Sequence, residues 1–125
     1  MTEDQFISAL AVSNLSKKDT LRRINDYIEY NQNPSCKYLK GRKVRLSKYL
    51  EATIPRKDAT ARMRTFFVGI DIIKKSHIVS FRIHKKLNEY EFVGFDKHGT
   101  QIRVHVREEI EKSNKTLYFI SSFQT

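Results

Sequence analysis

Cysteine is nearly absent from this sequence, which has a single one, Cys36, among 125 residues. A lone cysteine cannot form an intramolecular disulfide, and no second cysteine is present to complete a Cys-x-x-Cys zinc motif. The chain also has no run of about 18 apolar residues and no charged-then-apolar leader, so we predict neither a transmembrane helix nor a secretory signal. We therefore expect a cytoplasmic protein, and its length favours a single domain over residues 1–125.

The sequence also lacks the motifs of several large enzyme classes. It contains no P-loop, no GxGxxG, no HExxH and no GxSxG. Its four histidines have no metal-ligand spacing to one another, so we expect neither a metal site nor a cofactor. Glu108, Glu109 and Glu111 form an acidic group, which we interpret as a solvated strand end rather than a metal-dependent nuclease site.

Acidic residues are scarce relative to basic ones, and the formal net charge is +10. An excess of this size is typical of proteins that bind a polyanion, chiefly nucleic acid. Residues 1–36 carry a net charge of −1, residues 37–64 carry +8 and residues 65–125 carry +3. A basic surface kept only for solubility is the alternative, but such surfaces usually mix both signs. We predict a nucleic-acid partner, with RNA favoured over DNA, and no membrane.

The N-terminal part of the chain, residues 1–54, has the hydrophobic spacing of helices. Two capping-box patterns, beginning at Thr2 and Ser16, predict two helices at the start of the chain. Over residues 35–53 the pattern remains helical but is interrupted by a glycine, which predicts two short helices or one kinked helix. Residues 55–64 then form a basic connector.

From residue 65 the periodicity changes to the two-residue alternation of strands. Five strand-like runs follow, over residues 65–73, 77–84, 89–95, 101–110 and 116–123. The short polar links between them imply antiparallel neighbours and hence a meander. Helices followed by strands predict an α+β fold, in which the N-terminal helices pack on one face of a C-terminal antiparallel sheet of about five strands, residues 65–125.

The clearest element is a predicted β-hairpin over residues 90–107. Its second arm alternates polar and apolar residues throughout, so its apolar residues share one face of the sheet and its basic residues share the other. These two sets are Ile102, Val104 and Val106, and Arg103, His105 and Arg107. The link from Asp96 to Gly99 suits a type I turn followed by a left-handed residue.

The strand periodicity also predicts which side chains form the core. These are Phe66, Val68, Ile70, Val79, Phe81, Ile83, Val93, Phe95, Ile102, Val104, Val106, Leu117, Phe119 and Phe123. The opposite, open face then carries Arg82, His84, Tyr90, Phe92, Arg103, His105, Arg107, Tyr118 and Ser122. Aromatic rings interleaved with Arg and His suit stacking on bases and pairing with phosphates. The ordinary alternative is the solvated polar face of an antiparallel sheet.

Further candidates for nucleic-acid contacts come from the basic segment that precedes the predicted sheet. They are Lys37, Lys40, Arg42, Lys43, Arg45, Lys48, Arg56, Lys57, Arg62 and Arg64. Such residues contact phosphates and position a nucleic acid without reading its sequence.

Two of the histidines are candidates for catalysis. Metal-independent RNA cleavage needs a base for the 2′-hydroxyl proton, an acid for the leaving oxygen and cations near the phosphate, and imidazole, with an unperturbed pKa of about 6.5, suits both proton roles. His105 lies between Arg103 and another arginine, which would stabilise charge on the phosphate and favour the neutral imidazole. His84 is the partner that we would test first, while His77 and His98 fall in predicted turns and are expected to be exposed.

The order of elements and two sequence segments resemble a known group of proteins. Helices followed by an antiparallel meander, with IRVHVREE on one strand and LYFISSF on the last, resemble the small metal-independent ribonucleases and toxins grouped around barnase, EndoU, the tRNA-cleaving colicins and RelE-type toxins. The resemblance covers residues 37–125. It implies a site built from basic residues and strand His, Arg, Tyr or Ser, for which the matching residues are Lys40, Arg45, Arg103, His105, Tyr118 and Ser122. The chain departs from the group in having an extra N-terminal helical segment and no evident acid–base pair.

Three hypotheses about function follow from the sequence. The first is an RNA-directed protein that acts as a metal-independent, toxin-like endoribonuclease, with His105 as base or acid. The second is a DNA- or RNA-binding protein without catalysis. The third is a small interaction protein, such as an inhibitor or assembly factor, whose basic face docks on an acidic partner protein.

Overall fold

A computed structural model describes residues 16–30, 33–83, 87–111 and 114–125. The helix predicted from Thr2 and the candidate His84 lie outside these described residues. Within them the chain forms four α-helices, a short 3₁₀ turn and a six-stranded sheet. The helical elements are α2 (Lys17–Tyr30), η1 (Lys37–Leu39), α3 (Tyr49–Thr53), α4 (Ala59–Met63) and α5 (Phe66–Lys75). The strands are β1 (Ser35–Cys36), β2 (Arg42–Arg45), β3 (Ile78–Ile83), β4 (Leu87–Phe95), β5 (Gln101–Glu111) and β6 (Asn114–Gln124).

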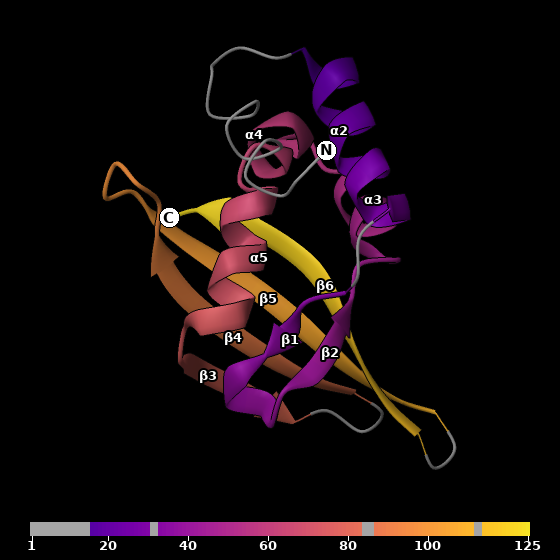
Figure 1. Cartoon of the computed structure of the whole chain (residues 1–125), viewed down its shortest axis with the longest axis vertical. Helices are drawn as coiled ribbons and strands as arrows, with labels where there is room; N and C mark the ends of the chain where they lie inside the picture. Colours follow the sequence, from indigo (N-terminus) through magenta and orange to yellow (C-terminus); the bar gives the residue numbers. More distant parts are fainter. Residues whose placement is uncertain (1–15, 31–32, 84–86, 112–113) are drawn as a thin grey trace.

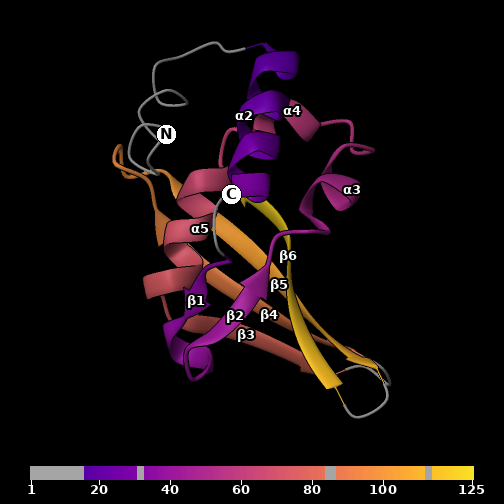
Figure 2. The same cartoon turned by 45° about the vertical axis from the view of Figure 1, so that its right-hand side comes forward.

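The sheet has the strand order β1-β2-β6-β5-β4-β3. All neighbouring strands are antiparallel except β2 and β6, which run parallel. Helix α5 packs on one face of the sheet, while α2 and α4 lie together near one end and the β5–β6 hairpin projects at the other (Figures 1 and 2). The predicted α+β class is therefore confirmed, but the sheet is mixed and has six strands rather than five.

The first predicted strand, over residues 65–73, is wrong, because most of this segment forms α5. A short apolar run cannot be assigned to strand or helix from periodicity alone. In the folded chain, α5 is enclosed by the sheet, β1 and η1, and it buries Phe66, Phe67, Ile70 and Ile73 among others. Its Asp71 and the lysine four residues later form an exposed ion pair of 3.0 Å. Enclosure on several sides explains why the sequence of this helix lacks a polar face wide enough to reveal it.

The predicted helices over residues 35–53 are also largely wrong. Only Tyr49–Thr53 is an α-helix, whereas β1 and β2 form a small antiparallel hairpin. The chain reverses at Lys40 and Gly41, whose φ angles of 59° and 72° are left-handed and incompatible with a continuous helix. Parallel pairing with β6 then adds β2 to the main sheet. The predicted connector over residues 55–64 contains a further helix, α4.

The predicted β-hairpin is confirmed, and its turn joins β4 to β5 as expected. Phe95 pairs with Gln101, and the amide of Gly99, with a φ of 79°, donates a hydrogen bond of 3.0 Å to the carbonyl oxygen of Asp96. The Asp96 carboxylate also accepts hydrogen bonds from the amides of His98 (2.8 Å) and Thr100 (2.9 Å). These bonds satisfy backbone donors inside the turn, so the turn is specified by local chemistry.

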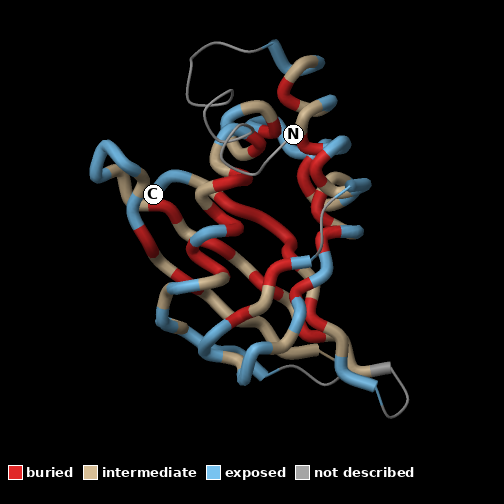
Figure 3. The backbone as a smooth tube through the Cα atoms, viewed as in Figure 1, coloured by how far each residue is buried: buried red, intermediate tan, exposed pale blue. Residues whose placement is uncertain are grey.

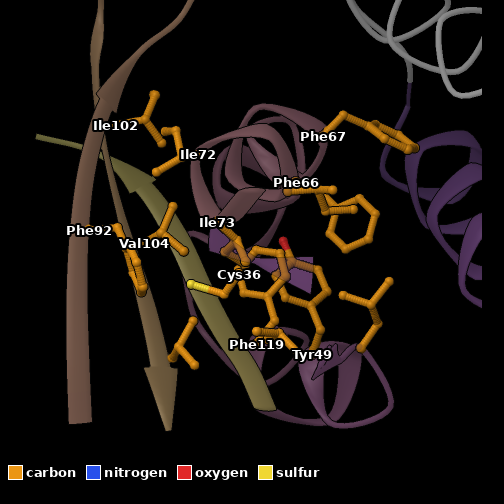
Figure 4. Packing of buried hydrophobic residues seen from close by; sticks show 14 of the residues in the cluster. Cys36, Tyr49, Phe66, Phe67, Ile72, Ile73, Phe92, Ile102, Val104 and Phe119 are labelled. Atoms are coloured by element: carbon orange, nitrogen blue, oxygen red, sulfur yellow. The ribbon is translucent and has the colours of Figure 1, made fainter. Parts of the chain in front are cut away.

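The core lies between α5 and the sheet, and Figure 3 shows the buried residues concentrated in α5 and the central strands. Aromatic rings fill much of it: Phe66 stacks on Phe119 with a centroid distance of 5.6 Å, and Tyr49 contacts both rings (Figure 4). On the other side of the cluster, Phe92 and Val104 point from the strands toward α5 (Figure 4).

Four residues predicted to be in the core are exposed. Val79, Phe81 and Ile83 of β3 have exposed fractions of 54%, 47% and 76%, because β3 is an edge strand that the helices do not cover. Phe95 is 66% exposed at the end of β4. Among the described residues, no helix combines the length and apolar character needed to cross a bilayer.

Candidate nucleic-acid interface

The face of the sheet turned away from α5 carries a row of side chains that crosses five strands. Arg45 on β2 pairs with Tyr118 on β6, which pairs with Arg107 on β5, then Glu89 on β4 and finally Arg82 on β3. Residues directly opposite one another on neighbouring strands point to the same face of a sheet. Three arginines and a tyrosine from distant parts of the sequence therefore share this face.

A second row lies beside the first and has His105 near its centre. His105 on β5 pairs with Ser121 on β6 and with Glu91 on β4, and Glu91 pairs with Ser80 on β3. The two rows confirm that Arg82, Arg107, His105 and Tyr118 lie on one open face, as the alternation predicted.

A β-bulge determines which serine of β6 joins this face. His105 pairs with Ser121 but the next residue of β5 pairs with Phe119, so Ile120 is an extra residue in β6. In a regular strand, Tyr118 and Ser121 would point to opposite faces. The extra residue of the bulge shifts the alternation, so both side chains lie on the open face. Ser122 therefore points into the core, and its predicted place on the open face is wrong.

Tyr90 and Phe92 are likewise not on the open face. They pair with Val106 and Val104, whose side chains face α5, and Phe92 is completely buried. A change of one residue in the assumed phase of a strand moves every side chain to the opposite face. In β4, apolar residues occur at both odd and even positions. The alternation alone therefore did not show that Glu89 and Glu91 lie on the open face.

Two adjoining pockets lie on the open face and share His105 and Glu89. One has a volume of about 110 Å³ and is lined by Arg56, Glu89, His105, Val106, Arg107, Ile120 and Ser121. The other has a volume of about 90 Å³ and is lined by Ser80, Arg82, Glu89, Tyr90, Glu91 and His105. Pockets that enclose whole small molecules measure roughly 300–1,000 Å³. Each of these pockets therefore suits one group of a larger ligand. We call the pocket that contains Arg56 the His105 pocket.

Two polar atoms of the His105 pocket lack a hydrogen-bond partner among the described residues. They are the Nε atom of Arg107 and the Oγ atom of Ser121, and both are buried. Ser121 as a whole is 1% exposed. Buried polar atoms without a partner are uncommon in folded proteins and cost about 1–3 kcal/mol each. An anionic ligand with several acceptor oxygens would satisfy both donors.

His105 is held by a carboxylate that the sequence analysis missed. Its Nε2 atom lies 2.8 Å from Oε2 of Glu91, and the same carboxylate accepts a hydrogen bond from Arg103. Burial raises the pKa of Glu91, but the hydrogen bond with His105 and the charge of Arg103 outweigh it, and the pKa lies below its usual value. The sequence did contain a signal for this carboxylate: Glu89 and Glu91 are two residues apart in a strand, so both acids lie on the same face. His105 therefore has an acidic partner in addition to the two arginines that flank it on β5.

The connection between α3 and α4 supplies a further basic side chain to this region. Arg56 lies in this connection and lines the His105 pocket. Tyr49, Thr53 and Arg62 anchor the connection, because Thr53 bonds to the carbonyl oxygen of Ile120 at 3.4 Å and Tyr49 bonds to that of Arg62 at 3.4 Å. A basic connector was predicted here, but its position over the open face depends on these long-range contacts.

Several predicted phosphate contacts are instead paired within the protein. Lys48 bonds to Glu109 and lies 4.3 Å from the ring centroid of Tyr118. Arg62 forms an ion pair of 2.9 Å with Asp58 and lies over the ring of Phe123. The remaining exposed basic residues include Lys37, Lys40, Lys43, Arg45, Arg56 and Lys57. Arg64 is also exposed.

Arg42 joins a polar cluster on the helix side of the sheet. Its guanidinium bonds to Glu108, which is only 2% exposed and also accepts hydrogen bonds from Asn88 (2.7 Å) and Tyr90 (3.5 Å). Burial raises the pKa of Glu108, but the hydrogen bonds from Asn88 and Arg42 outweigh it and hold the pKa below its usual value. The interpretation of Glu108 as part of a solvated strand end is therefore wrong.

The other two described histidines lie away from the pockets. His77 and His98 are both exposed, as predicted, and His77 packs against the ring of Tyr38 at 3.9 Å. No three His, Cys, Asp or Glu side chains gather to hold a metal ion in the part of the chain that the structure describes. Comparison with known proteins found no matching family model, no matching curated protein and no matching solved structure.

Proposed function

We propose that this chain binds RNA on the open face of its sheet and cleaves it as a metal-independent endoribonuclease. The observation that carries the proposal is that His105, bonded to Glu91, lines the same pocket as Arg56, Arg107 and Ser121. This pocket combines a proton-transfer group with the positive charge and hydrogen-bond donors that a phosphodiester requires.

In the proposed reaction, a ribose 2′-oxygen attacks the adjacent phosphorus and the bond from phosphorus to the 5′-oxygen breaks. The products are a 2′,3′-cyclic phosphate and a 5′-hydroxyl. Because Nε2 of His105 faces Glu91, its Nδ1 atom takes the proton from the 2′-hydroxyl group. Glu91 stabilises the resulting imidazolium, as the carboxylate of a catalytic triad does, and the departing 5′-oxygen takes a proton from solvent.

The basic side chains stabilise the charge that grows on the phosphate in this reaction. Arg56 and Arg107 line the His105 pocket and match phosphate oxygens geometrically better than lysine would. Ser121 donates a hydrogen bond from its buried hydroxyl. Arg82, in the adjoining pocket, binds a neighbouring part of the RNA.

The test is incubation of the purified protein with total RNA in the presence of a chelator. We expect cleavage that leaves cyclic phosphate ends, and a loss of about 100-fold or more in His105→Ala, in line with the contribution of a general base. His98→Ala is the matched control, because His98 is exposed in the β4–β5 turn, and it should cleave like the wild type. Intact RNA, or unchanged cleavage by His105→Ala, would contradict the proposal.

Nucleic-acid binding without cleavage is the second candidate, favoured by the exposed cations that line the same sheet. It predicts intact RNA together with an affinity that falls steeply with salt concentration. A flat salt response would argue against both nucleic-acid functions. In that case a protein that co-purifies in stoichiometric amount and survives nuclease treatment would favour the third hypothesis, an interaction factor with an acidic partner.

A further inference from the structure

A second basic depression lies toward the β1–β2 edge of the sheet, where β2 runs beside β6. It has a volume of about 250 Å³ and is lined by Arg42, Lys43, Arg45, Lys115, Thr116 and Leu117. We call it the β2–β6 groove. Four of its six lining residues are cationic and none is acidic, in contrast to the His105 pocket, which contains Glu89.

Three of the four cations are available to a ligand. Arg42 is engaged by Glu108 and by the carbonyl oxygen of Lys115. Lys43, Arg45 and Lys115 are exposed, and in the described part of the chain no carboxylate lies within ion-pair distance of them. Like charges held close together repel one another, so this arrangement favours an anion that carries more than one negative charge.

The groove is aligned with the His105 pocket through the sheet itself. Arg45 begins the cross-strand row that continues through Tyr118 to Arg107, which lines that pocket. Neighbouring strands are about 4.8 Å apart, so the backbones of Arg45 and Arg107 are separated by about 10 Å. This separation is comparable with the distance between nearby phosphates of one extended nucleic-acid strand.

We propose that the β2–β6 groove is a second phosphate-binding site, which holds a single-stranded RNA one or two nucleotides away from the phosphate in the His105 pocket. The inference rests on the proposed function for the choice of RNA. A single strand is favoured over a duplex because Tyr118 lies on the sheet surface between the two sites, where an aromatic ring can stack on an unpaired base, whereas a duplex is usually read by a helix or ribbon inserted into a groove.

The test compares two triple variants that lose the same charge at different places. The groove variant is Lys43→Gln/Arg45→Gln/Lys115→Gln, and the control variant is Lys17→Gln/Lys18→Gln/Lys97→Gln, whose three lysines are exposed and lie outside both sites. Binding of a fluorescent 2′-O-methyl oligouridine of about ten nucleotides, which cannot be cleaved, is measured by anisotropy over a range of salt concentrations. Thermal unfolding followed by circular dichroism verifies that both variants are folded.

The groove variant should bind the oligonucleotide at least tenfold more weakly than the wild type at low salt. Its slope of log affinity against log salt should fall by about 2, since each lost contact to a single strand contributes roughly 0.7. The control variant should retain most of the wild-type affinity and most of its salt dependence. A 2′-O-methyl dinucleotide has one phosphate and cannot occupy both sites at once, so its affinity should fall less in the groove variant than the affinity of the longer oligonucleotide does.

Equal weakening by both triple variants, or unchanged binding by the groove variant, would overturn the inference. Equal affinity for a duplex or for inorganic polyphosphate would overturn the assignment to single-stranded RNA. Because the probe cannot be cleaved, this experiment is independent of catalysis. Intact RNA in the cleavage assay together with the expected loss in the groove variant would remove the endoribonuclease proposal and leave the second phosphate site standing.

Discussion

At the scale of single residues, Glu91 fixes the orientation of His105, the proposed general base. The carboxylate holds Nε2 of His105 and also binds Arg103, so one acidic side chain orients this imidazole and a cation together. Replacement by glutamine keeps the size of the side chain but removes its charge. The stabilisation of a protonated His105 would be lost with that charge.

For Glu91→Gln we therefore expect kcat for RNA cleavage to fall at least tenfold while KM changes little, because the lost interaction acts in the transition state. Steady-state kinetics with a defined oligoribonucleotide provide the measurement. Glu51→Gln is the matched control, since Glu51 is exposed on α3. A rise in KM at constant kcat would show instead that Glu91 serves only to shape the binding surface.

At the scale of elements, the position of α5 depends on its close approach to the sheet. A methyl group at Gly94 of β4 would lie 2.5 Å from Cγ1 of Ile72 in α5, well inside contact distance. Gly69 of α5 is similarly close to Phe119 of β6. The two glycines let the helix lie flat on the strands whose other face carries the pockets.

Gly94→Ala should lower the free energy of unfolding by about 1–3 kcal/mol, as expected for overpacking. Urea unfolding of the purified protein measures the change. Combining it with Ile72→Ala tests the cause, because removing the clashing atoms should make the double variant more stable than the sum of the two single effects predicts. Strict additivity would mean that the glycine acts through backbone conformation rather than through this contact.

At the scale of the whole molecule, two carboxylates link stability to pH. The pKa of Glu91 and that of Glu108 both lie below the ordinary value of 4.5 in the folded protein. A lowered pKa in the folded state means that the stabilisation is fully present above the ordinary value and is lost as the pH falls through the folded one. The protein should therefore lose stability on acidification below about pH 4.5.

Glu108→Gln tests the buried part of this effect. At neutral pH it should lower the free energy of unfolding by about 1–3 kcal/mol, because it removes the charged acceptor of the hydrogen bonds from Arg42 and Asn88. Its stability should also depend less on pH in the acidic range than that of the wild type. Urea unfolding at neutral and acidic pH measures both effects. If the variant lost stability on acidification as steeply as the wild type, other carboxylates would control the pH dependence of stability.

Some features of this protein were determined by the sequence alone because they depend on near neighbours. The β4–β5 turn follows from Asp96 and Gly99. The strict alternation of β5 places His105 and Arg107 on one face of the sheet and Val104 on the other, independently of the rest of the fold. The concentration of basic charge in residues 37–64 is likewise a property of the sequence. These features are the basis for predicting a nucleic-acid partner and for choosing His105 as the candidate general base.

Only the tertiary structure decided which residues meet around that histidine. Whether residues 66–75 form a helix or a strand, and which phase β4 adopts, depends on what covers each segment rather than on its own pattern. A bulge in β6 brings Ser121, rather than Ser122, beside His105. Arg56 reaches the same pocket because α3 and α4 pack on β6. Each of these outcomes depends on contacts between distant parts of the chain. The energies of such contacts cannot be inferred from the local sequence.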